Sequence, residues 1–247
     1  MIVAFRLKER HHFIFNRLLS ITLLKSMNLV SPINLDFFNF DIPLLRSKES
    51  AFAIEDLPGL WRIHWQVGDK TIISTFYTRI DQACLLWGVI SIAIFATAQF
   101  LPISWSLQAI WWSALTVFGT LGMHLLTEPW SRFEHFKWVL RWWAWLMLGG
   151  VVVTDLSIFC GWGDMLLQLC PLWLGLNAVG YLGTGWRMRS RAFIVVALIH
   201  LLGIFILPYF AAWQFLLTGV VIGVSALLIA ELQWDSNGNC TQEILAD

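Results

Sequence analysis

Charge is what this sequence has least of. Charged residues make up 13% of its 247 residues, against about 25% in soluble globular domains. Apolar residues make up 58%, which exceeds the about 45–50% of ordinary soluble proteins. A soluble protein of this length does not cover its surface with so few charges, so the composition indicates an integral membrane protein. The formal net charge is zero, and no overall field therefore favours a nucleic-acid partner.

Motifs for the common enzymatic chemistries are also missing. The four cysteines form no CxxC pair, which speaks against zinc ribbons and thioredoxin-like redox chemistry. The sequence contains no P-loop, GxSxG or HExxH motif. Residues 161–164 match the letters of the GxGD motif of intramembrane aspartyl proteases, but the expected position of Asp164 is an outer turn. The sequence therefore predicts no catalytic residue and no metal site.

Long charge-free runs give the fold class. No charged residue occurs between Asp81 and Glu128, or between Arg191 and Glu231. Each run is about twice the roughly 20 residues that one membrane span needs. Prolines interrupt both runs, which predicts helical hairpins. We expect an all-α bundle over residues 81–230, with six membrane-spanning helices in three hairpins at about 82–102, 106–126, 138–159, 165–185, 192–208 and 211–230.

The positive residues predict the orientation of these spans. Three predicted connections, near residues 103, 162 and 209, contain no Lys or Arg. Lys and Arg are retained in the cytoplasm, so both termini are predicted to be cytoplasmic, in the plasma membrane or an internal bacterial membrane. The tail, 231–247, has neither residue and gives no independent evidence. All sixteen Lys and Arg precede residue 81 or lie in the second-to-third or fourth-to-fifth connection.

The region before the first span has two parts. Residues 1–26 are basic and apolar, which is typical of an amphipathic helix on a membrane surface; the alternative is that the chain truly starts at Met27. Residues 27–80 resemble a cytoplasmic cap or tether. Within it, WRIHWQV and TIISTFYT flank a Gly-Asp-Lys turn, which predicts a β-hairpin.

Ionisable and polar residues inside spans are costly and are the candidates for function. Asp155 lies near the outer end of the third predicted span, and His200 lies near the middle of the fifth. Asn177 and Tyr181 share one face of the fourth span at i, i+4 spacing. These four residues form one hypothetical polar transport site. His200 is also a candidate ligand for a tetrapyrrole, although no second histidine lies at its depth. The simpler interpretation is a neutral imidazole hydrogen-bonded to a neighbouring helix.

Small residues and cysteines complete the candidates. Gly219 and Gly223 form a GxxxG pair in the sixth span, which favours close helix packing and leaves this span as the candidate face for a membrane partner or a second copy. Cys160 and Cys170 flank a predicted outer loop, and the sequence leaves a disulfide between them open.

Three functions are compatible with this pattern. The first is a binding, assembly or accessory subunit of a larger membrane complex, which fits sixteen tryptophans, short loops and the lack of paired charges inside the spans. The second is a small transporter that uses the polar site. The third is tetrapyrrole binding at His200. We expect the lipid bilayer as the constant partner.

Overall fold

The computed structural model describes residues 43–48, 50–51, 59–67, 70–133 and 137–235. The chain divides into two compact units after Phe37, and every described residue belongs to the second unit. The predicted amphipathic segment, 1–26, and most of the tail, 231–247, lie outside the described residues.

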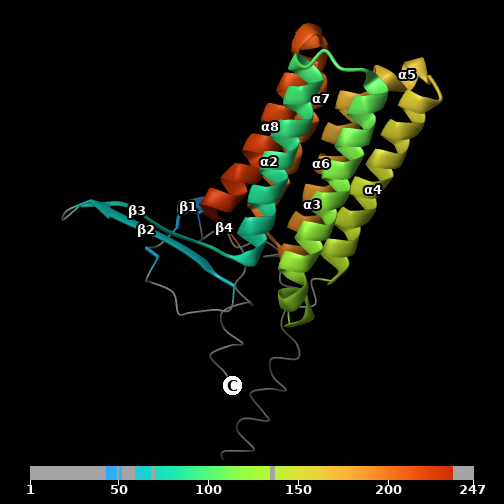
Figure 1. The fold of residues 1–247 in the computed structure, drawn as a ribbon. Helices are drawn as coiled ribbons and strands as arrows, with labels where there is room; N and C mark the ends of the chain where they lie inside the picture. Colours follow the sequence, from blue (N-terminus) through green and yellow to red (C-terminus); the bar gives the residue numbers. More distant parts are fainter. Residues whose placement is uncertain (1–42, 49, 52–58, 68–69, 134–136, 236–247) are drawn as a thin grey trace, which may run out of the picture. The chain divides into compact units, whose positions relative to one another are not determined.

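Helices dominate the described part of the chain (Figure 1). Each of the two charge-free runs forms two long helices, as predicted. The first run is interrupted at residues 101–104, and the second is interrupted at the 3₁₀ turn η2, Leu207–Trp213. The fourth predicted span begins later than expected, because the short helix α5, Gly163–Leu166, precedes it. The long helices are α2 (Arg79–Phe100), α3 (Trp105–Phe133), α4 (Lys137–Phe159), α6 (Leu169–Met188), α7 (Arg191–Ile206) and α8 (Gln214–Glu231).

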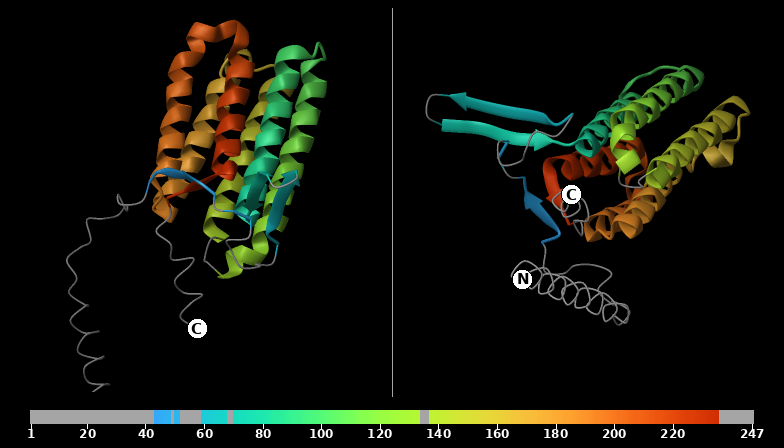
Figure 2. Two further views of the ribbon diagram at one scale, coloured as in Figure 1. Left: turned by 90° about the vertical axis from the view of Figure 1, so that its left-hand side faces the viewer. Right: turned by 90° about the horizontal axis from the view of Figure 1, so that it is seen from below.

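Neighbouring helices pack in chain order, and the last returns to the first. α2 contacts α3, α3 contacts α4, α4 contacts α6, and α6 packs along α7. The contact between α8 and α2 is the most extensive between any two of the described elements. α8 also contacts α6 and α7. Figures 1 and 2 show this ring of helices, with α8 beside α2 although 113 residues separate Phe100 from Gln214. The bundle therefore encloses an interior that all these helices border.

The contact between α2 and α8 depends on glycine. A Cβ atom added to Gly219 would lie 2.6 Å from the Phe95 Cβ, and one added to Gly223 would lie 2.6 Å from the Ile92 Cγ1. Real atoms do not approach so closely, so these two positions admit no side chain without a shift of α2. The predicted GxxxG pair thus faces a helix of the same chain.

Four helical stretches of the described residues are long and apolar enough to cross a membrane. The last of them has 41 residues and contains both α7 and α8, which pack against each other and against η2. α6 is not among the four, because Asn177, Thr184 and four glycines lower its mean hydropathy. The stretches are Arg79–Phe100, Trp105–Glu128, Lys137–Phe159 and Arg191–Glu231.

Two small antiparallel ribbons accompany the helices. The predicted hairpin forms from β2 (Trp61–Val67) and β3 (Lys70–Tyr77), with Trp61 opposite Tyr77 and Val67 opposite Lys70. The second ribbon pairs β1 (Leu45–Ser47) with β4 (Leu232–Trp234). The chain before α2 is thus hydrogen-bonded to the chain after α8.

A buried lysine joins the hairpin, α2 and α8. Thr78 and Asp81 form a capping box that starts α2, because each side chain accepts a hydrogen bond from the other residue's backbone N–H. Lys48 Nζ lies 2.7 Å from Asp81 Oδ2, and each of the two side chains is 5% exposed. The same ammonium donates to the carbonyl oxygens of Phe76 and Ala230. One cation therefore holds three elements together.

Asp235 performs a similar role for α7. Its Oδ1 accepts hydrogen bonds from the Ser190 hydroxyl and the Ala192 N–H, both at 2.9 Å. Its Oδ2 accepts from the Arg191 backbone N–H at 3.1 Å and from Arg191 Nε at 2.7 Å. A carboxylate at the positive end of a helix is stabilising, so the residue that follows β4 caps the start of α7.

Candidate functional site: a cavity inside the helical bundle

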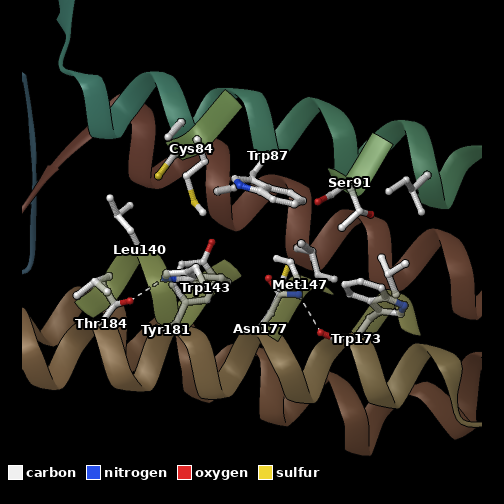
Figure 3. A pocket seen from close by; sticks show the side chains of 18 of the residues that line it. Cys84, Trp87, Ser91, Leu140, Trp143, Met147, Trp173, Asn177, Tyr181 and Thr184 are labelled. Carbon is white, nitrogen blue, oxygen red and sulfur yellow. Dashed lines mark hydrogen bonds between the residues drawn. The ribbon is translucent and has the colours of Figure 1, made fainter. Parts of the chain in front are cut away.

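A cavity of about 150 Å³ lies between the helices. Figure 3 shows side chains from α2 and α6 pointing toward one another across it. Its walls are mainly aromatic and aliphatic, and no Asp, Glu, Lys, Arg or His is among its lining residues. The most prominent are Trp87 and Phe95 of α2, Trp112 of α3, Trp143 and Met147 of α4, and Trp173 of α6.

The cavity is elongated along the helices. On α2 its lining residues run from Ile80 to Phe95, and on α6 they run from Trp173 to Met188. At about 1.5 Å of rise per residue, each of these stretches covers about 22 Å. A volume of about 150 Å³ spread over that length describes a narrow slot rather than a round chamber.

Several polar side chains that line this slot have hydrogen-bonding capacity left. Ser91, Asn177 and Tyr181 all line it. Asn177 uses its Nδ2 on the Trp173 carbonyl oxygen at 2.8 Å, which leaves its Oδ1 as an acceptor. Within the described part of the chain, the hydroxyls of Ser91 and Tyr181 have no hydrogen-bond partner. The slot therefore offers neutral donors and acceptors but no charge.

Threonines fix two of the tryptophan walls. Trp143 Nε1 donates to Thr184 Oγ1 at 2.9 Å (Figure 3). Thr184 in turn donates to the Gly180 carbonyl oxygen. Trp173 Nε1 donates to Thr154 Oγ1 at 3.2 Å. Satisfied indole N–H groups hold the rings in one orientation, so these walls are built into the fold.

The structure brings only part of the predicted polar site to the cavity. Asn177 and Tyr181 line it, as their shared helical face requires. His200 does not line it. The His200 side chain is 0% exposed and lies behind Tyr181, with the two ring centres 5.2 Å apart. Its Nδ1 is 2.8 Å from the Val196 carbonyl oxygen, and its Nε2 is buried without a hydrogen-bond partner.

Asp155 reaches the cavity only through a neighbour. The Ser113 hydroxyl donates to its carboxylate, with oxygen–oxygen distances of 2.8 and 3.0 Å. Ser113 lines the cavity, and Asp155 does not. No ion pair joins Asp155 to His200, both of which are described. The predicted transport site is thus divided into a slot, one carboxylate beside it and one histidine behind it.

Other predicted candidates lie apart from the slot. Cys160 is exposed and Cys170 is buried, and both are free thiols. Asp164 belongs to the short helix α5. Among the described residues, no three His, Cys, Asp or Glu side chains are grouped so that they would hold a metal ion.

Sequence reasoning missed Ser91 and most of the tryptophan walls. A single serine in an apolar helix resembles any small packing residue, so nothing local distinguishes Ser91. The i, i+4 pairing of Asn177 with Tyr181 was a usable signal, because it placed two polar groups on one face of α6. No comparable signal connects α2 with α6, which lie 69 residues apart in the chain.

The chain matches no protein-family model, no curated protein and no solved structure. Functional inference therefore rests on the slot and on the contacts around it.

Proposed function

We propose that this chain is a six-span membrane protein that binds a small, neutral, mostly apolar molecule in the slot of its helical bundle. The observation that supports this function is the slot itself. Protein interiors contain few voids larger than a water molecule. An unfilled cavity costs about 24 cal/mol per Å³, so 150 Å³ corresponds to about 3–4 kcal/mol of lost stability. A ligand that fills the slot recovers that loss.

The lining specifies the class of ligand. A charged group would enter an environment without a counter-charge, which costs several kcal/mol or more. A neutral hydroxyl, carbonyl or ether oxygen would find Ser91, Asn177 and Tyr181. The volume matches that of an engineered cavity that binds benzene, about 150 Å³, and is below the about 300–1,000 Å³ of drug-sized pockets, so the slot would hold the polar group and an adjoining segment of a long ligand rather than all of it. Length and narrowness favour a hydrocarbon chain with one neutral polar group over a ring system, and a tetrapyrrole at His200 gains no support from this slot.

Two observations support the proposed topology of six spans with both termini cytoplasmic. The Lys and Arg residues alternate between the connections as described above. In addition, β1 precedes α2 and β4 follows α8, and the two strands pair. Paired strands lie on the same side of the membrane, so the chain between them crosses it an even number of times. The positive residues then favour the cytoplasmic side for both strands.

A matched pair of variants tests the binding function. Ser91→Phe places a ring in the slot, whereas Val89→Phe adds the same ring two residues away on a side chain that is 63% exposed and does not line the slot. The purified protein in nanodiscs is incubated with radiolabelled 1-hexadecanol, and retained probe is counted after washing. Palmitate, which has the same chain length and a charged end, is the comparison probe.

The proposal expects about one hexadecanol retained per wild-type chain and per Val89→Phe chain. Ser91→Phe should lower the affinity at least about tenfold, which corresponds to 1.4 kcal/mol. Palmitate should bind more weakly than hexadecanol to the wild type. Equal retention by Ser91→Phe and Val89→Phe would show that the probe binds only the lipid-facing surface, and the proposed function would then be wrong.

Ser113 supports a second candidate, a transporter whose slot is coupled to Asp155. The Ser113 hydroxyl lines the slot and donates to the Asp155 carboxylate. Asp155→Asn keeps the size of the side chain and removes its charge. For this candidate it should abolish transport of the slot's ligand into proteoliposomes while the protein remains folded. The accessory role in a larger complex stays a prediction, and co-purification of a partner in mild detergent tests it.

A further inference from the structure

The hairpin β2–β3 has one face on which four large apolar side chains are exposed in the described part of the chain. Residues opposite each other across an antiparallel pair share a face of the ribbon. Trp65 lies opposite Ile73, and Ile63 and Trp61 belong to the same face, two and four residues before Trp65. Their side chains are exposed by 56% (Trp61), 44% (Ile63), 59% (Trp65) and 43% (Ile73). We call these four residues the hairpin's apolar face.

The opposite face of the hairpin is polar except for the buried Phe76 at its base, and it is partly covered by the chain. It carries Arg62, His64 and Ser74. The backbone N–H of the buried residue Ala51 donates to the Ser74 hydroxyl at 3.0 Å. At the base of the ribbon Phe76 and Tyr77, one on each face, are buried against the chain. Beyond this base the ribbon is amphipathic, and its apolar side chains are exposed.

The hairpin is attached directly to a candidate membrane span. Only Thr78 separates β3 from α2, and α2 is one of the stretches long and apolar enough to cross a membrane. The Gln82 side chain donates to the carbonyl oxygens of Tyr77 and Gly59, which fixes the base of the ribbon to the first turn of α2. The hairpin therefore starts at the level where that span enters the bilayer.

Its direction also suits a membrane surface. Figures 1 and 2 show β2 and β3 leaving the foot of α2 sideways, away from the other helices and across their direction. β2 has seven residues, which at about 3.3 Å each give a length of about 23 Å. A ribbon that crosses the helix direction at the end of a span lies parallel to the bilayer surface.

We infer that the hairpin's apolar face rests in the headgroup layer of the same bilayer that the helices cross. Trp is the side chain that prefers this layer, because its ring is apolar and its N–H remains near water. An isolated two-stranded hairpin is marginally stable in water, and burial of the apolar face in lipid gives it the missing partner. The occupant is thus a lipid surface, and this inference is independent of the slot and its ligand.

Spin labels on adjacent residues test the inference in the full chain. The four native cysteines are replaced by alanine, and single cysteines are placed at Ile63 on the apolar face and at His64 on the polar face. Val89→Cys, on the exposed surface of α2, is the lipid-facing reference. Each protein is spin-labelled in nanodiscs of phosphatidylcholine and phosphatidylglycerol at a molar ratio of about 3:1, a mildly anionic surface. Collision rates with oxygen and with Ni(II)-EDDA are measured.

The inference expects the label at residue 63 to collide with Ni(II)-EDDA at least about fivefold less often than the label at residue 64, and to favour oxygen as Val89→Cys does, as expected for an interfacial apolar face. Equal access of the nickel complex to both positions would overturn it. Low access of both reagents to residue 63, together with dipolar broadening between labels, would also overturn it, because a second copy would then cover the face. Hexadecanol binding is measured on the same proteins, so that a failure of this inference can be distinguished from a failure of the proposed binding function.

Discussion

Lys48→Met is the substitution for which the structure gives the clearest magnitude. The methionine keeps the apolar stem of the lysine and removes the ammonium. That ammonium lies 2.7 Å from Asp81 Oδ2 and also donates to the carbonyl oxygens of Phe76 and Ala230. The Asp81 side chain is 5% exposed, so the substitution leaves a buried carboxylate whose remaining hydrogen-bond partner is Thr78. Breaking a buried ion pair in this way costs about 3–5 kcal/mol.

Unfolding in mixed micelles, followed by far-UV circular dichroism over an SDS titration, measures this free energy. Arg46→Met is the matched control, because Arg46 is an exposed basic residue on β1 two positions before Lys48. The control should change the free energy of unfolding by no more than about 0.5 kcal/mol. The double variant Lys48→Met/Asp81→Asn removes the stranded charge and should recover about 1–3 kcal/mol of the loss.

The reasoning fails if Lys48→Met stays within about 1 kcal/mol of the wild type, the range of exposed ion pairs. It also fails if the double variant is as unstable as the two single losses added together. Either outcome would mean that the ion pair is solvated in the membrane protein and does not hold the hairpin, α2 and α8 together.

Two further predictions concern the ends and the interior of the bundle. Burial raises the pKa of Tyr77 from 10.0 to about 12, and the hydrogen bond of 2.7 Å that its hydroxyl donates to Glu231 is the second cause of this rise. The protonated phenol is therefore favoured in the folded state, so its contribution to stability is complete below pH 10 and is lost as the pH rises through about 12; thermal melting should fall more steeply over that window in the wild type than in Tyr77→Phe. Gly219→Ala should cost about 1–3 kcal/mol, because its Cβ would lie 2.6 Å from that of Phe95, whereas Gly149→Ala, with nothing within 4 Å, should be tolerated. Melting of the two alanine variants in one detergent checks this contrast, and equal melting temperatures would contradict it.

Much of the helical arrangement could be predicted because the signals are local. Charge-free runs interrupted at Pro102 and Pro208 gave the breaks between α2 and α3 and near η2. β-Branched and aromatic residues on both sides of a Gly-Asp-Lys turn predicted the β2–β3 hairpin. Both patterns reflect which residues tolerate lipid, turn or strand conformations, and these preferences act over a few residues.

Contacts between distant segments gave no such signal. β1 and β4 have three residues each and pair across 184 intervening residues. The sequence of neither strand indicates which segment it pairs with. Lys48 resembled any basic residue of the cytoplasmic segment, and only the structure assigns it to Asp81. Asp235 likewise caps α7 only because β4 positions its carboxylate beside Ser190.

The slot shows how the same limitation affects function. Its polar groups come from helices that are distant in the chain, with Ser91 on α2 and Asn177 and Tyr181 on α6. α6 is the long helix that hydropathy alone does not select, and Asn177 and Thr184 are part of the reason. Both of these residues are buried inside the bundle, where they meet protein groups instead of lipid. A helix enclosed by its neighbours can keep polar residues that a lipid-facing helix would exclude. The low hydropathy of α6 and its place beside the slot thus have one physical cause, which is its enclosure by neighbouring helices. A weakly apolar helix between strongly apolar ones is therefore the sequence pattern that would locate such a cavity.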